Sequence, residues 1–65
     1  MRFYARVNAT REVVTVEKVL YAGDNDPQYE ITYKDGSRDR LSEWMAKSEL
    51  TSLRDDNGKV ITIKH

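Results

Sequence analysis

The chain has 65 residues, and its 11 Lys and Arg residues balance its 11 Asp and Glu residues, so its formal net charge is zero. This length leaves room for a single domain over residues 1–65. The absence of Cys excludes disulfides, thiolate metal sites and a Cys nucleophile. Because small secreted domains usually depend on disulfides, and no apolar run is long enough to span a membrane, we expect a cytoplasmic protein, or a nuclear one in a eukaryote.

The beginning of the chain has the patterns of two β-strands. Residues 2–7 alternate apolar and polar side chains, which predicts a half-buried strand with Tyr4 exposed. Residues 12–21 are rich in β-branched residues and predict a longer strand. Val16 and Val19 in this second strand have opposite parity, so the buried face changes along it and a bulge or sharp bend is expected.

Turn signals frame two further strands in the middle of the chain. Residues 22–27 combine Gly, Asn, Asp and Pro, which favour turns. Residues 29–33 alternate cleanly and predict a strand, and the Asp-Gly pair that follows is typical of a hairpin. Residues 38–45 predict the returning strand, with Leu41 and Trp44 as its apolar anchors.

The last part of the chain predicts one helical turn and a closing strand. Residues 46–53 have some helical character but are too few for an independent helix, so one turn, of 3₁₀ type, is expected. A turn at residues 55–58 precedes a β-branched strand at residues 60–63. Five short strands at this spacing predict an all-β fold, a small SH3-like barrel with one short helical turn before the last strand.

The expected core contains most of the large apolar side chains of these strands. Trp44 is expected to be one of its anchors, although a single Trp could instead stack on a nucleic-acid base. The expected core residues are Phe3, Val7, Val14, Val16, Val19, Ile31, Leu41, Trp44, Leu50 and Ile61.

The stretch from Tyr29 to Leu50 carries a family resemblance. An aromatic strand ending in Tyr33 meets a polar turn, and Ser42-Glu43-Trp44-Met45 follows, with Leu50 after a short turn. This pattern resembles the chromo-barrel or Tudor-knot domains. The resemblance implies an SH3-like barrel and two activities: recognition of methylated lysine by a cage of aromatic rings, and nucleic-acid binding by basic surface residues.

The resemblance places Tyr33 at a cage position. The family's other cage aromatics fall near Gly36 and Ser37 and at Leu41, where this chain has none, so we expect an incomplete cage. Recognition of methylated lysine would then need other rings, such as Tyr21 or Tyr4, to lie close to Tyr33.

Two groups of basic residues could form a binding face. One group surrounds the hairpin and the other marks the first strand and its exit, where Arg11 lies. If the groups lie side by side, they could neutralise several phosphates; if they do not, they form a solvated surface that Asp35 and Asp39 offset. The candidate binding residues are Arg2, Tyr4, Arg6, Tyr33, Lys34, Arg38 and Arg40.

No residue pattern in the chain indicates catalysis, so we expect a non-enzymatic protein without a metal or cofactor. Asp24, Asp26 and Glu30 lack the spacing of a calcium loop and are better explained as turn residues, and His65 has no acid or base partner. The first hypothesis is a module that binds RNA or DNA backbone. The second is a protein-interaction or regulatory accessory module, of the kind that phages and mobile elements encode, acting as a monomer or weak homodimer.

Overall fold

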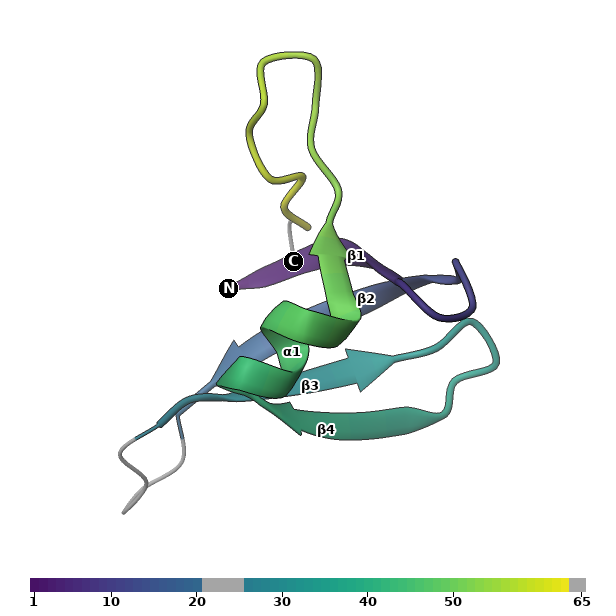
Figure 1. Ribbon diagram of the computed structural model, residues 1–65, viewed down its shortest axis with the longest axis vertical. Coiled ribbons are helices and arrows are strands. Elements are labelled where there is room, and N and C mark those ends of the chain that lie inside the picture. Colours follow the sequence, from purple (N-terminus) through teal and green to yellow (C-terminus); the bar gives the residue numbers. More distant parts are fainter. Residues whose placement is uncertain (21–25, 64–65) are drawn as a thin grey trace.

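A computed structural model describes residues 1–20 and 26–63 of the chain. These residues form one antiparallel sheet with the strand order β4-β3-β2-β1-β5, and one short helix precedes β5 (Figure 1). This confirms the all-β class, the five strands and the helix before the last strand. The elements are β1 (Arg2–Val7), β2 (Val13–Val19), β3 (Gln28–Thr32), β4 (Arg38–Ser42), α1 (Glu43–Glu49) and β5 (Leu50–Ser52).

The sheet is open between its two edge strands, β4 and β5. In the described part of the chain, β4 pairs only with β3, and β5 pairs only with β1. Helix α1 connects the two and lies across one side of the sheet (Figure 1). We call this side the inner face and the opposite side the outer face.

The strand registers bring the apolar positions together on the inner face. Phe3 pairs with Val16, and Val16 pairs in turn with Ile31, so alternate positions of neighbouring strands point to the same side. This is the reason why the alternation in the sequence correctly predicts β1 and β3. The buried core consists of Phe3, Ala5, Val14, Val16, Ile31, Leu41 and Ala46.

Three residues of the expected core lie elsewhere. Trp44 is 72% exposed on α1, because the strand that was expected to carry it ends two residues earlier. Val19 has the opposite parity to the buried Val16 and belongs to the outer face. Ile61 is exposed in the segment after β5. The two remaining residues of the expected core are partly buried and pack against the buried core. These two residues are Val7 and Leu50.

The helix is longer and begins earlier than predicted. It is an α-helix over Glu43–Glu49 rather than one 3₁₀ turn within residues 46–53. Glu43 in its first turn and Lys47 in its last turn match the helix dipole, and they form an i,i+4 ion pair with 3.9 Å between Nζ and Oε1. Burial of Ala46 holds the helix against the sheet.

The closing strand predicted at residues 60–63 is replaced by two isolated β-bridges. Leu50–Ser52 pairs with Ala5–Val7 and is the last strand of the sheet, β5. The predicted segment forms an isolated bridge with β1 near the beginning of that strand, between Phe3 and Thr62. Beside this bridge, the Tyr4 amide donates to the Ile61 carbonyl over 3.2 Å. The remaining bridge, between Arg54 and Val60, closes a hairpin that extends away from the sheet (Figure 1).

Strand β2 contains no bulge in its described pairing. It pairs residue by residue with β1 over Val13–Glu17 and with β3 over Thr15–Val19. The change of parity at Val19 therefore reflects a side chain on the outer face and not a bend, so the expected bulge is wrong. Tyr21 and most of the turn expected at residues 22–27 lie outside the described residues.

Candidate functional site

The outer face carries a row of charged side chains across four strands. Arg2 on β1 pairs with Glu17 on β2, Glu17 pairs with Glu30 on β3, and Glu30 pairs with Arg40 on β4. Directly paired residues point to the same side of a sheet, so the four side chains share the outer face. The charged row thus has an arginine at each end and two glutamates in the middle.

A second row on the same face is polar. Tyr4 on β1 pairs with Thr15, Thr15 pairs with Thr32, and Thr32 pairs with Arg38 on β4. Arg6 lies two residues beyond Tyr4 on β1, where successive outward positions fall on the same side. The outer face therefore carries four arginines and Tyr4 around a centre of threonines and glutamates.

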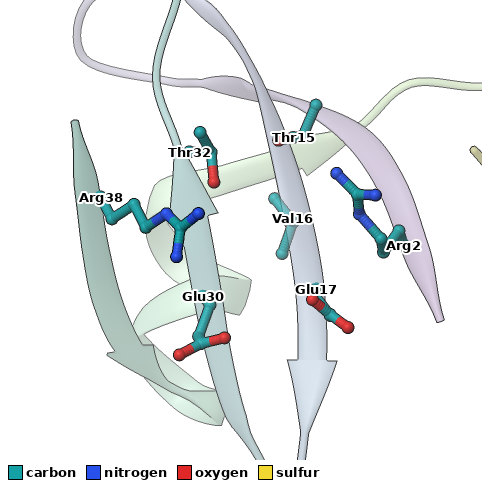
Figure 2. Close-up of a pocket in the computed structure, with 7 residues that line it drawn as sticks. All are labelled: Arg2, Thr15, Val16, Glu17, Glu30, Thr32 and Arg38. Carbon is teal, nitrogen blue, oxygen red and sulfur yellow. The ribbon is translucent and has the colours of Figure 1, made fainter. Parts of the chain in front are cut away.

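The two rows border a hollow of about 240 Å³ (Figure 2). Arg2 lies on its β1 side and Arg38 on its β4 side, and between them lie the side chains of β2 and β3. We call this feature the outer hollow. Its lining residues are Arg2, Thr15, Val16, Glu17, Glu30, Thr32 and Arg38.

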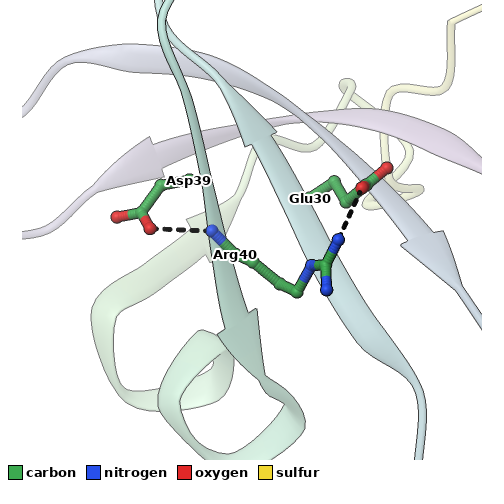
Figure 3. Close-up of polar contacts among 3 residues, drawn as sticks. All are labelled: Glu30, Asp39 and Arg40. Carbon is green, nitrogen blue, oxygen red and sulfur yellow. Dashed lines mark hydrogen bonds and ion pairs between the residues drawn. The ribbon is translucent and has the colours of Figure 1, made fainter.

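Arg40 is oriented by an ion pair within the charged row. Its Nη2 atom lies 3.5 Å from Oε1 of Glu30, and the two side chains are 55% and 38% exposed (Figure 3). At this exposure an ion pair contributes little to stability, so its effect is to hold the guanidinium across β3. Glu17 is half-buried, and within the described part of the chain its side chain forms no hydrogen bond or ion pair.

The structure brings five of the candidate binding residues together. The two basic groups predicted from the sequence converge because β1 and β4 present the same parity to the outer face. Tyr33 and Lys34 follow β3 and do not belong to the two rows, and Arg11 lies at the turn after β1 with a φ of 61°. The five residues on the outer face are Arg2, Tyr4, Arg6, Arg38 and Arg40.

Sequence reasoning missed the centre of this face. Thr15, Glu17 and Thr32 were not among the candidate residues, although their alternation with apolar neighbours in β2 and β3 was a usable signal. The bulge expected in β2 made this alternation uninformative, because a bulge would have moved Glu17 to the other side of the sheet. Glu30 was considered only with Asp24, which lies outside the described residues, as a cation site.

Tyr33 lies at a second concave site, on the inner face. This cleft has a volume of about 380 Å³ and is bordered by the turn after β1, the β3–β4 hairpin and α1. Its apolar lining includes Leu41 and Met45, and Asp39 and Glu49 lie at its edge. Burial raises the pKa of the Tyr33 phenol, and nearby carboxylates, with Asp39 the strongest, raise this pKa further. We call this site the Tyr33 cleft.

No described helix is long and apolar enough to cross a membrane. Within residues 1–20 and 26–63, no group of three or more His, Asp or Glu side chains is placed to hold a metal ion. No protein-family model, no curated protein and no solved structure matches this chain.

Proposed function

We propose that the protein is a non-enzymatic module that binds nucleic acid through its outer face. The observation that carries this proposal is the convergence of the two arginine groups on that face, with Arg2 and Arg6 on β1 and Arg38 and Arg40 on β4. The zero net charge of the whole chain does not oppose it, because the four arginines share their face with only two carboxylates of the charged row.

The arginines would act on the phosphate backbone. Three inter-strand steps of about 4.8 Å separate the backbones of β1 and β4, so the backbones that carry the two arginine groups lie about 14 Å apart. The arginine side chains can extend toward each other across the outer face. Guanidinium groups donate paired hydrogen bonds to phosphate oxygens, which suits them to this contact better than Lys. Each released counterion then adds to affinity, with little dependence on sequence.

Tyr4 would supply a stacking surface beside the arginines. It is 38% exposed in the middle of β1, and its row places it in line with the threonine hydroxyls of the outer hollow. Stacking of a base on an exposed aromatic ring contributes about 1–3 kcal/mol. A ring between cationic side chains is a common arrangement on surfaces that bind single strands.

For the fold, we propose a chromo-barrel or Tudor-knot type of SH3-like barrel whose sheet stays open. The position of β5 beside β1 and the helix between β4 and β5 support this assignment. The exposed Trp44 departs from it, since the resemblance assigned that residue a structural position.

A fluorescence anisotropy titration with short single- and double-stranded oligonucleotides at low salt tests the proposed function. We expect saturable binding that weakens steeply as salt increases. Absence of binding tighter than about 10⁻⁴ M, the weak end of non-specific affinity, would contradict it.

A second candidate function is recognition of a protein partner at the Tyr33 cleft. The cleft joins an apolar lining and one phenol ring to the carboxylates of Asp39 and Glu49, a combination that suits a cationic side chain with a long aliphatic stem. Methylated lysine is one such ligand. Tyr33 is the sole aromatic residue that lines the cleft within the described residues, and Tyr4 lies on the outer face.

Calorimetric titration with lysine peptides in unmodified and trimethylated forms tests this second function. Binding that is lost in Tyr33→Ala but retained when the outer-face arginines are changed would favour the cleft. Strand addition at β4 is a weaker route to a partner, because Asp39 already accepts the hydrogen bond of an edge amide (Figure 3).

A further inference from the structure

We infer that the outer face selects single-stranded nucleic acid whose bases carry amino groups, and that Glu17 reads those groups. This inference rests on the proposed function and narrows it to a substrate class. It follows from the two glutamates of the charged row, which a surface that contacted only phosphate would exclude.

The width of the sheet favours a single strand. Five strands at about 4.8 Å spacing give a face about 19 Å wide, whereas the major groove of B-DNA is about 12 Å wide. The outer face therefore cannot enter the groove in which duplex base edges are displayed. A single strand, whose bases are free to turn toward the sheet, can place them over the outer hollow.

The order of charges in the row determines where backbone and bases lie. Arg2 and Arg40 occupy the ends of the row, and Glu17 and Glu30 lie between them. A phosphate above the carboxylates would be repelled, so the backbone is confined to the arginine ends of the face. The space above the glutamates is left to groups that donate hydrogen bonds.

Glu17 is the carboxylate available to a ligand. Glu30 is engaged by Arg40 at 3.5 Å, whereas the Glu17 side chain borders the outer hollow with no polar partner among the described residues. A half-buried carboxylate of this kind gains most when a ligand supplies the missing donors. Thr15 lies two residues before Glu17 on β2, on the same side of the sheet, and adds a hydroxyl that can donate or accept a hydrogen bond.

Base chemistry then separates the four bases. Cytosine, adenine and guanine each carry an exocyclic amino group that can donate to a carboxylate, and Glu is a known acceptor for the cytosine amino group. Thymine and uracil have a single ring N–H between two carbonyl oxygens, and these oxygens repel the carboxylate. Glu17 should therefore favour cytosine over thymine by roughly tenfold, the effect of one good base contact.

Anisotropy titrations with ten-nucleotide oligo(dC) and oligo(dT) at pH 8 test this inference, with oligo(rC) and oligo(rU) as a parallel pair. We expect cytosine strands to bind roughly tenfold tighter than thymine or uracil strands, and tighter than a duplex of the same length. In Glu17→Gln, whose side chain both donates and accepts, the ratio should fall close to one. Asp56→Asn, which removes the same charge from the exposed turn of the C-terminal hairpin, should keep the wild-type ratio.

The outcomes separate this inference from the proposed function. Equal binding of cytosine and thymine strands by the wild type, or tighter binding of the duplex, would overturn the inference and leave nucleic-acid binding intact. Absence of binding to every probe would overturn the proposed function itself. A tenfold ratio that persists in a folded Glu17→Gln protein, checked by circular dichroism, would show that another residue reads the base.

Discussion

Arg2 and Arg38 line the same hollow on the outer face, although β2 and β3 separate the strands that carry them (Figure 2). Their positions follow from the registers alone, because Arg2 and Arg38 have the same outward parity on β1 and β4. A chain with no net charge can thus present a cationic rim on one side. Glu17 and Glu30 lie between these arginines, and other carboxylates lie elsewhere on the surface, such as Asp39 and Glu49 at the Tyr33 cleft.

The exposure of Trp44 predicts that this residue contributes little to stability. Trp44→Ala should lower the free energy of unfolding by no more than about 0.5 kcal/mol, the usual effect of an exposed substitution. Ile31→Ala, at a side chain that is 1% exposed, should cost about 2–5 kcal/mol. Urea denaturation measures both, and a Trp44→Ala protein as unstable as Ile31→Ala would contradict the position of α1.

The fluorescence of this single Trp gives an independent check. In the native protein it should emit close to the wavelength of free tryptophan in water and be quenched readily by acrylamide. A blue-shifted and protected Trp would show that the ring is buried.

Asp39 accepts a hydrogen bond from a backbone amide at the edge of β4, and we expect this to hinder pairing with another chain. The Tyr33 amide donates to the Ser37 carbonyl over 2.8 Å, so Tyr33 and Ser37 are a hydrogen-bonded pair. Hydrogen-bonded and non-hydrogen-bonded pairs alternate along an antiparallel ladder, which makes Glu30 and Arg40 a non-hydrogen-bonded pair. The Arg40 amide therefore points away from β3. Asp39 Oδ1 accepts from this amide at 2.8 Å. Asp39→Ala should therefore expose an edge donor and increase self-association in sedimentation velocity at high concentration.

Asp39→Asn is the control for this edge effect. It removes the charge but keeps an oxygen acceptor for the Arg40 amide, so it should sediment like the wild type. If Asp39→Ala also sediments like the wild type at every concentration, the side chain does not guard the edge.

Strand positions were predictable where one face of a strand is buried along its whole length. In β1 and β3 the alternation is unbroken, because every inward position meets α1 or a neighbouring strand. The sequence pattern was less informative at Trp44, since a large apolar ring suggests a core position whether or not the chain has already entered a helix. The signals for that helix were the Glu43 and Lys47 pair and a Ser at its N-cap, and they are local and weak.

The raised pKa of Tyr33 predicts a loss of stability at alkaline pH. The folded state disfavours the phenolate because of burial and the nearby carboxylates, whereas an unfolded tyrosine ionises near pH 10. Stability should therefore be retained below about pH 10 and fall as the pH rises through the higher folded pKa. Tyr33→Phe should lose less stability than the wild type between pH 9 and 11 in urea titrations; an equal loss would rule out this source.

The β3–β4 hairpin has the opposite pH dependence. Oδ1 of Asp35 accepts hydrogen bonds from the Ser37 hydroxyl at 2.6 Å and the Ser37 amide at 2.9 Å, and these bonds lower the pKa of the Asp35 carboxyl. The stability they add is present above the ordinary value near pH 4 and is lost as the pH falls through the lower folded pKa. Thermal melts from pH 6 to pH 2.5 should show a smaller acid decline in Asp35→Asn, and an identical decline would contradict this.

The candidate site was predictable only in part, for a reason of geometry. Parity within one strand indicated that Arg2, Tyr4 and Arg6 share a side, but apart from the Asp-Gly hairpin that joins β3 to β4, the sequence does not indicate which strands are neighbours. The placement of Glu17 between two arginines depends on the order β4-β3-β2-β1, so it emerges only from the assembled sheet.

The salt dependence of single-strand binding tests the central claim most directly. The comparison is between wild type, Arg2→Gln/Arg38→Gln on the outer face, and Lys47→Gln/Lys59→Gln on α1 and the C-terminal hairpin, which removes the same charge elsewhere. Each phosphate contact contributes about 0.7 to the slope of log K against log salt for a single strand. We expect the arginine pair to reduce this slope by about 1.4, two contacts, and the lysine pair to leave it unchanged. Equal slopes for all three proteins, or a larger loss in the lysine pair, would contradict binding through the outer face.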